Sequence, residues 1–259
     1  MISPVTPPPD AILAGLDQVL AAVIPGHPMA AVILPVGEPV SGADPAPALL
    51  AADELATLRS FTLPKRREQW RAGRICAKQA IARYLQRHFP ALPCPDARDI
   101  RIGNRPSGRP FIDTANPALA GLDLSISHSG GFAAALVSAT ACGIDIQEDA
   151  PALERVSERF CRGEERDLLP CLPGSGAMQR LNLIWTAKEA ARKAARDARM
   201  PGFLELALAA PAITAAGWLL WAARDAGGGR PGPATTIITT HFDIYALSIA
   251  LETGENSHA

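Results

Sequence analysis

The 259-residue sequence lacks the features of a secreted, membrane-spanning or zinc-binding protein. Its first Lys or Arg is Arg59, so the N-terminus has no basic region of the kind that begins a secretory signal. No apolar run approaches the ~18 residues of a membrane span. The five cysteines are odd in number, scattered and without a CxxC pair, which argues against a disulfide framework and a zinc site. We therefore expect a cytoplasmic protein with free thiols and no membrane partner.

Aromatic residues are also scarce, at 5%, while hydrophobic residues make up 48% and charged residues 20% of the chain. The formal net charge is only −1. This composition is typical of an ordinary globular protein, and the length allows one large domain or two modest ones.

Basic residues are concentrated between Arg59 and Arg109. This stretch contains thirteen Lys and Arg but only three acids, whereas the first 58 residues contain no basic residue. Such a block predicts a polyanionic partner or a solvated surface. The block has few aromatic residues for base stacking and matches no nucleic-acid-binding signature. A phosphate-rich small molecule explains the charge about as well as nucleic acid does.

The pattern of apolar residues predicts an α+β protein. Helical spacing indicates long helices over 65–89 and 179–196, and shorter ones over 11–24, 53–60, 153–160 and 164–169. Strand patterns occur at 30–36, 100–102, 123–127, 132–138, 143–147, 217–223, 235–242 and 244–251. Each half thus offers a long helix followed by a meander of strands. We predict two similar α+β subdomains, residues 1–139 and 140–259, with loose segments at 1–9 and in the Gly-rich loop from Asp225.

The first of three motifs is Gly143-Ile-Asp-Ile-Gln147. On a strand, Asp145 and Gln147 point to one face and the two isoleucines to the other. An acid and an amide on one face of a buried strand suit half of a hard-metal site. On this motif alone, an Asp in a turn at a strand end is the commoner explanation.

The second motif is Trp185-Thr-Ala-Lys-Glu-Ala-Ala-Arg-Lys193. Glu189 and Lys193 are four residues apart, so they share a helical face with Trp185. One explanation is a solvated Glu–Lys pair, and another is a capping box with Thr186 at the N-cap and Glu189 at N3. The alanines beside Glu189 would instead let a ligand or another backbone approach closely.

The third motif is Ser125-Ile-Ser-His-Ser-Gly-Gly131, a strand that runs into a glycine turn. Hydroxyls and backbone N–H groups surround His128, which suits phosphate binding. A single His in a turn is more often structural, and no obvious Asp partner supports a Ser-His-Asp hydrolase.

Together the motifs resemble the 4′-phosphopantetheinyl transferase superfamily, in its surfactin- and enterobactin-type form, in which one chain is built as a pseudo-dimer. The resemblance covers roughly residues 59–196, and the GxD and WxxKExxxK motifs are its most specific part. The matching elements follow the family's order: KRR at 65–67, GR at 73–74, GRP at 108–110, SISHS at 125–129, GIDIQ at 143–147, FCRGEERDLL at 160–169 and WTAKEAARKA at 185–194.

The resemblance implies that the chain transfers the phosphopantetheine arm of coenzyme A to a serine of an apo acyl or peptidyl carrier protein, which releases 3′,5′-ADP. Asp145 and Glu189 would bind Mg²⁺, which prefers carboxylate oxygens and bridges to the pyrophosphate. Lys193 would bind the cofactor and neutralise charge on the leaving phosphate. Glu164 matches the family's candidate base for the serine hydroxyl, a task that Glu189 could share.

The resemblance also assigns the basic block to coenzyme A. Arg74, Arg109 and one of Arg66 or Arg67 would form the pocket for the 3′-phosphate of the nucleotide. Two further residues, Ser127 and His128, would contact phosphate. The block is then explained without nucleic acid, and a monomer is expected because a two-half chain completes its own site.

One position departs from the family's pattern. Surfactin-type members usually have a third acid where this chain has Gln147. An amide oxygen can still ligate Mg²⁺ or hold its water, with less charge, so Gln147 is the third candidate metal ligand. Glu148 should point to the opposite face of the strand and is a poor substitute.

Two other functions fit part of the sequence. A Mg²⁺-dependent nucleotide phosphohydrolase would share the carboxylates and the basic pocket but would need no protein partner. A non-catalytic coenzyme A or nucleic-acid binder would have no need of Glu189. Release of 3′,5′-ADP only when an apo carrier is present distinguishes the transferase from the phosphohydrolase. In the binder, Glu189→Ala should leave affinity and biological function intact.

Overall fold

The computed structural model describes residues 9–37, 46–114, 116–195, 200–225 and 235–253. The chain divides into two compact units. The N-terminal unit is His27–Ala139, and the C-terminal unit combines residues 140–259 with the start of the chain. Loose segments were predicted at residues 1–9 and in the loop from Asp225. Pro9 begins a helix and Asp225 ends a strand, while residues 1–8 and 226–234 lie outside the described residues.

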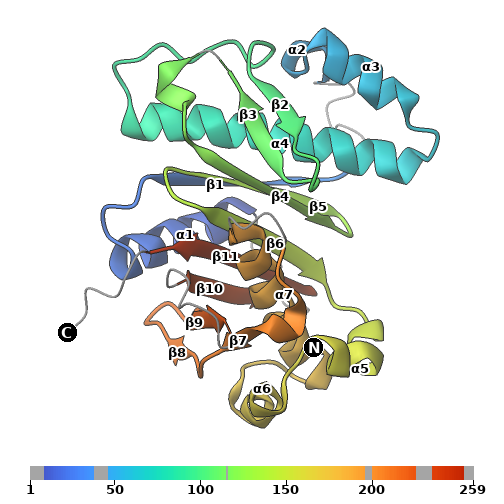
Figure 1. Ribbon diagram of the computed structural model, residues 1–259, viewed down its shortest axis with the longest axis vertical. Helices are drawn as coiled ribbons and strands as arrows, with labels where there is room; N and C mark the ends of the chain where they lie inside the picture. The colour runs from blue at the N-terminus through green and yellow to red at the C-terminus, as the bar shows by residue number, and fades with distance from the viewer. Residues whose placement is uncertain (1–8, 38–45, 115, 196–199, 226–234, 254–259) are drawn as a thin grey trace. The chain divides into compact units, whose positions relative to one another are not determined.

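In the N-terminal unit, a long helix packs on a three-stranded antiparallel sheet (Figure 1). The sheet has the order β1-β5-β4, and a separate hairpin pairs β2 with β3. The elements are β1 (Met29–Pro35), α2 (Ala46–Leu49), α3 (Ala52–Ser60), α4 (Pro64–His88), β2 (Arg101–Asn104), β3 (Pro110–Asp113), β4 (Asp123–Ser129) and β5 (Phe132–Ser138). Pro64 begins α4 with its φ preset for a helix, and Pro90 follows its end. Small and apolar side chains of α4, such as Ala77 and Ile81, form the core with Val137 of β5.

In the C-terminal unit, α7 packs on β6, β11 and β10 of an antiparallel sheet with the order β6-β11-β10-β9-β7 (Figure 1). The elements are α1 (Pro9–Val23), β6 (Cys142–Glu148), α5 (Ala152–Val156), α6 (Gly163–Leu168), α7 (Ala177–Ala194), β7 (Leu206–Leu208), β8 (Ala212–Ile213), β9 (Leu219–Asp225), β10 (Thr235–Phe242) and β11 (Tyr245–Glu252). Strand β8 pairs with β9.

These two units confirm the predicted α+β class. Both long helices and most strands lie within a few residues of the predicted bounds, and β5 and β10 match them fully. The predicted helix 153–160 is wrong in part, because it gives way to a 3₁₀ turn at Ser157–Arg159. The predicted division at residue 139 placed the first helix in the N-terminal half, whereas α1 groups with the C-terminal unit.

Each unit contains a buried Lys–Glu ion pair that fastens a short helix to the long helix. Lys78 Nζ lies 2.6 Å from Glu54 Oε2, and Lys188 Nζ lies 2.6 Å from Glu165 Oε2. Both glutamates stand at N3 of their helices, where they accept the N–H of the N-cap residue. The two units therefore use the same device on α3–α4 and on α6–α7.

The five cysteines are free thiols, and only two of them are exposed, Cys94 and Cys171. Burial raises the pKa of Cys161 to about 11 and raises the pKa of Cys76 further. Among the described helices, none is long and apolar enough to cross a membrane.

Candidate active site

The candidate site of the C-terminal unit begins where β6 crosses α7 at very short range. A Cβ added to Gly143 would lie 1.9 Å from the Ala190 carbonyl oxygen and 2.8 Å from the Ala194 nitrogen. Only a glycine on the strand, opposite alanines on the helix, allows this approach. The small side chains of α7 therefore let the backbone of β6 pack closely against the helix, and this contact brings the strand motif and the helix motif together.

This approach joins Asp145 of β6 to Lys193 of α7. Lys193 Nζ donates to Asp145 Oδ1 at 2.7 Å and to the Ile144 carbonyl oxygen at 3.0 Å. Asp145 is only 6% exposed. A charge-assisted bond of this length holds a carboxylate firmly, so the Asp is part of a built cluster rather than an Asp of a solvated turn.

Glu189 completes the cluster, and its charge is disfavoured there. Burial first, and then the negative charge of Asp145, raises the pKa of Glu189 above the usual range of a carboxyl group. Lys193 and Arg192 oppose this rise in pKa, and Arg192 Nη1 lies 2.9 Å from Glu189 Oε1. Two carboxylates that repel each other at a half-buried position attract a cation.

Both alternative explanations of the helix motif are wrong. Thr186 and Glu189 lie inside α7, so they form no capping box, and Thr186 Oγ1 donates to the Asn182 carbonyl oxygen. Glu189 pairs with Arg192, and Lys193 pairs with Asp145, instead of with each other.

Trp185 and Lys188 of the same motif have structural roles. Trp185 stacks on Phe203 with ring centroids 4.4 Å apart and meets Phe160 edge-on at 5.0 Å. Lys188 is fully buried and donates to the Phe160 and Phe203 carbonyl oxygens besides its pair with Glu165. Burial lowers the pKa of Lys188, and Glu165 partly restores it. Lys188 and Glu189 thus point in different directions from α7 and have different partners.

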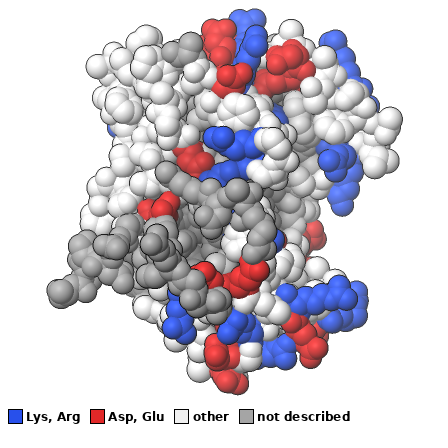
Figure 2. All heavy atoms as spheres, viewed as in Figure 1, with Lys and Arg blue, Asp and Glu red and all other residues white. Residues whose placement is uncertain are grey.

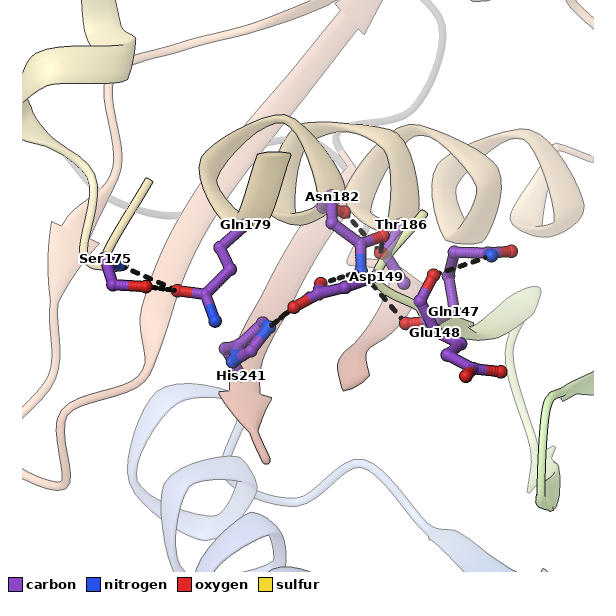
Figure 3. Close-up of polar contacts among 8 residues, drawn as sticks. All are labelled: Gln147, Glu148, Asp149, Ser175, Gln179, Asn182, Thr186 and His241. Atoms are coloured by element: carbon purple, nitrogen blue, oxygen red, sulfur yellow. Dashed lines mark hydrogen bonds and ion pairs between the residues drawn. The ribbon is translucent and has the colours of Figure 1, made fainter. Parts of the chain in front are cut away.

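The side-chain amide of the third candidate ligand, Gln147, bonds to the backbone of the next residue. Its Nε2 donates to the Glu148 carbonyl oxygen at 2.9 Å (Figure 3). Strand alternation places Gln147 on the face of Asp145, and the two residues lie opposite Ala246 and Ser248 of β11.

The structure separates the roles of the two neighbouring glutamates on α6. Glu165 is 1% exposed and accepts bonds from Lys188, Arg162 N and Leu208 N. Glu164 has a side chain that is 75% exposed and lies 3.6 Å from Arg162 Nε. Glu165 is therefore a structural residue, and Glu164 is the one that solvent or a protein can reach.

In the N-terminal unit, Arg74 is the best-buried of the arginines predicted to bind phosphate. It is 7% exposed, its Nη2 donates to Asn104 Oδ1 at 3.1 Å, and its guanidinium lies over the Trp70 ring. Its Nε is buried and has no hydrogen-bond partner. Burial lowers the pKa of Arg74, and Glu54 opposes this. A buried, unsatisfied donor on a cation favours an anionic ligand.

Two other predicted ligands stand at the exposed first turn of α4. Arg66 lies over the Phe61 ring at 5.7 Å, and Arg67 Nη2 donates to the Phe61 carbonyl oxygen at 2.9 Å. Both side chains thus turn back along the chain towards one residue.

Arg109 lies at the end of the turn between β2 and β3. Gly108 has φ +85°, a left-handed conformation that glycine adopts at no steric cost, and its N–H donates to the Arg105 carbonyl oxygen at 2.8 Å. The turn directs Arg109 to Asp123 of β4, with which it forms an ion pair. The predicted turn is thus confirmed, and Asp123 is a charge that the sequence did not lead us to expect beside it.

Ser127 and His128 lie on β4, which is two residues longer than predicted. The predicted turn position of His128 is wrong, because only Gly130 and Gly131 separate β4 from β5. Consecutive strand residues face opposite sides, and Ser127 is buried whereas His128 is exposed. His128 shares the face of Ile126, which packs against Gly73 beside Arg74.

Comparison with known proteins identifies the part of the chain that carries the first cluster. Residues 141–226 match the 4′-phosphopantetheinyl transferase superfamily. The matched segment includes Asp145, Glu164, Glu189 and Lys193. No curated protein matches the chain.

Several solved acyl-carrier-protein synthases are similar to the chain. The one from Bacillus anthracis, in complex with CoA (3′,5′-ADP), is 23% identical, with 42% of this chain and 92% of that chain covered and a TM-score of 0.34. The one from Plasmodium yoelii is 20% identical, with coverage of 44% and 95% and a TM-score of 0.35. The one from Thermotoga maritima is 22% identical, with coverage of 51% and 73% and a TM-score of 0.33.

Several side chains of the basic block between Arg59 and Arg109 form internal ion pairs. Lys78 pairs with Glu54, Arg71 with Glu68, Arg98 with Asp96 and Arg109 with Asp123. In several places on the face drawn in Figure 2, Lys and Arg side chains lie beside Asp and Glu side chains. The anion-binding capacity of the block thus depends on a few residues, above all Arg74, more than on its total charge.

Sequence reasoning missed three polar residues near β6: Asp149, and the two residues that bond to its carboxylate, Asn182 and His241. Asn182 could have indicated this cluster, because it is a polar residue within the apolar helical run LNLIW. Such a residue in a buried helical face needs hydrogen-bond partners.

Proposed function

We propose that this protein transfers the 4′-phosphopantetheine arm of coenzyme A to a serine of an apo acyl or peptidyl carrier protein, giving the holo carrier and 3′,5′-ADP. The proposal covers a surfactin- or enterobactin-type enzyme in which the two units are related as a pseudo-dimer, acting as a monomer in the cytoplasm. Its substrates would be the carriers of fatty-acid, polyketide, nonribosomal-peptide or siderophore synthesis.

The observation that carries the proposal is the cluster of Asp145, Glu189 and Lys193 at the crossing of β6 and α7. Two carboxylates and a lysine are held together within the segment that matches the superfamily. Transfer between phosphate oxygens depends mainly on positioning and on charge stabilisation, which such a cluster can supply.

The cluster fits Mg²⁺ by its donor chemistry. Among the described residues, no three His, Cys, Asp or Glu side chains gather to hold a metal on their own. Mg²⁺ is usually bound through one or two carboxylates together with substrate phosphates and water, so Asp145 and Glu189 suffice, with Gln147 as a further oxygen donor. The raised pKa of Glu189 indicates a place where added positive charge is favourable. When bound, the ion would neutralise charge on the pyrophosphate.

The remaining steps use side chains of the chain itself. The serine hydroxyl of the carrier attacks the phosphate that bears the pantetheine arm, and the bond to the 3′,5′-ADP oxygen breaks. Lys193 would stabilise the negative charge that forms on the leaving phosphate. The serine proton would pass to the exposed Glu164 or to Glu189.

The N-terminal unit would bind the nucleotide end of coenzyme A. Arg74 offers a buried guanidinium with an unsatisfied Nε, and His128 lies on the same side of the sheet. Arg109 and one of Arg66 or Arg67 would add charge for the 3′-phosphate. The predicted phosphate contact of Ser127 does not fit this pocket, because Ser127 faces the opposite side of β4 from His128. A guanidinium can bind a phosphate through two parallel hydrogen bonds.

Mass spectrometry of an apo carrier protein, after incubation with this protein, coenzyme A and Mg²⁺, tests the function. We expect the carrier to gain the phosphopantetheine mass, and Asp145→Ala and Glu189→Ala to lower turnover by orders of magnitude. Glu158→Ala, a change at an acid with an 85% exposed side chain, is the matched control. Near-normal transfer by either site variant would refute the proposed site. Release of 3′,5′-ADP without any carrier would indicate a phosphohydrolase instead.

A further inference from the structure

A second polar cluster lies at the other end of the contact between β6 and α7 (Figure 3). It joins three elements: Asn182 on α7, Asp149 just after β6, and His241 on β10. Asn182 is fully buried, and the side chains of Asp149 and His241 are 5% and 16% exposed. The cluster meets the proposed site at the backbone carbonyl oxygen of Gln147.

Asn182 uses both hydrogens of its amide on the end of β6. Its Nδ2 donates to the Gln147 carbonyl oxygen at 3.0 Å and to Asp149 Oδ1 at 2.7 Å. An amide nitrogen has two hydrogens to donate, so this group is fully engaged. Asp149 is held further by His241 Nε2, 3.1 Å from each carboxylate oxygen, and its own N–H donates to the Ile244 carbonyl oxygen at 2.7 Å.

The spacing along α7 places Asn182 in line with the proposed site. Residues seven and eleven positions apart return to nearly the same face of a helix, so Asn182, Glu189 and Lys193 form one stripe. Lys193 binds the Ile144 carbonyl oxygen, and Asn182 binds the Gln147 carbonyl oxygen. The backbone of β6 is thus fastened to α7 on both sides of Asp145, with Glu189 between the two fastening points on the helix.

The rest of the contact between β6 and α7 would not fix this register as firmly. At their closest approach, glycine packs against alanine backbone, with no side chain of Gly143 to interlock. Hydrogen bonds to carbonyl oxygens are directional, and they specify one position of the strand along the helix. The ladder with β11 holds β6 in the sheet, but without the Asn182 bonds only the Lys193 bond of these two would set the position of β6 along α7.

We propose that Asn182, supported by Asp149 and His241, is a positioning residue that keeps the Asp145–Gln147 end of β6 in register with Glu189. This inference rests on the proposed function. It assigns to Asn182 the relative placement of the two carboxylates, and no contact with substrate.

The test compares Asn182→Ala and the milder Asn182→Ser with Gln179→Ala. Gln179 is a matched control because it lies one turn earlier on α7, and its Oε1 accepts from Ser175 N and Oγ at 2.7 and 2.9 Å, away from β6 (Figure 3). The first measurement is amide hydrogen exchange of peptides covering 142–149, in the metal-free protein without substrate. We expect exchange about tenfold faster in Asn182→Ala, an intermediate effect in Asn182→Ser, and no change in Gln179→Ala.

The second measurement is carrier transfer at temperatures well below unfolding. We expect Asn182→Ala to lower kcat about 10- to 100-fold, because a misplacement of about 1 Å costs on this order. We expect a higher half-saturating Mg²⁺ concentration and a KM for coenzyme A within about threefold of the wild type. A network that only supports the core would lower the melting temperature and leave the Mg²⁺ dependence unchanged.

The outcomes separate the two proposals. If exchange is faster in Asn182→Ala but the wild type has no transfer activity, Asn182 does hold β6 in place and the proposed function is wrong. An active wild type, with unchanged exchange and Mg²⁺ dependence in both Asn182 variants, would overturn the positioning role. If Asn182→Ala does not fold, the same two measurements on Asn182→Ser decide.

Discussion

Changing Gly143 to Ala tests whether the close approach of β6 to α7 builds the site. The new Cβ would lie 1.9 Å from the Ala190 carbonyl oxygen, and ordinary contact begins at 3.4 Å, so the strand must move by about 1.5 Å (3.4 − 1.9). The opposing atoms belong to the backbone of α7 and cannot rotate away. The displacement therefore separates Asp145 from Glu189.

The expected cost has two parts. Overpacking of this kind destabilises a core by about 1–3 kcal/mol, and a 1 Å misplacement of reacting groups lowers turnover about 100-fold. Urea denaturation and the carrier-transfer assay measure these effects. The control is Gly163→Ala at the first residue of α6, where an added Cβ has no neighbour within 4 Å. Wild-type stability and turnover in Gly143→Ala would show that β6 and α7 do not depend on this contact.

Three further predictions follow from buried charges and from the basic unit. The pKa of Glu189 is raised in the folded state, so the stability of the wild type relative to Glu189→Gln should fall as pH rises from about 4 through that raised pKa. Thermal melts of both proteins with a chelator measure this, and a difference in stability that does not change with pH would contradict it. Lys188→Met should cost about 3–5 kcal/mol in urea denaturation, because Glu165 is left buried and unpaired, whereas Arg166→Met, at an exposed pair, should cost less than about 1 kcal/mol. Wild type should bind coenzyme A more tightly than 3′-dephospho-coenzyme A, and Arg109→Ala should reduce that preference; equal affinities in calorimetric titration of the wild type would refute this.

Local patterns were sufficient to predict most of the fold. Strand β10 was predicted to the residue because its β-branched run has a turn at its end. Helix α4 was predicted to within one residue at each end, with Pro90 marking where it stops. The bounds failed where two structures compete locally. The two-residue Gly turn draws His128 into β4, and Val156 ends α5 in a 3₁₀ turn.

The candidate site was predictable only in its chemical types. The sequence indicated Asp145, Glu189 and Lys193 as candidates, but not that Lys193 would pair with Asp145 and Arg192 with Glu189. Partners of this kind depend on which strand crosses the helix, and the crossing depends on a glycine. The sequence also could not show that Lys188 is fully buried while the adjacent Glu189 is only half-buried, because nothing in the pattern separates two neighbouring charged residues.

The distribution of thiols gives the chain its own pair of labelling positions. Cys94 lies in the N-terminal unit and Cys171 in the C-terminal unit, and both are exposed, while the other three cysteines are buried. Thiol reagents act on the thiolate, which burial suppresses at Cys76 and Cys161. Maleimide dyes should therefore attach at one position in each unit of the native protein. Energy transfer between two such dyes would report any change in the separation of the units when coenzyme A is added.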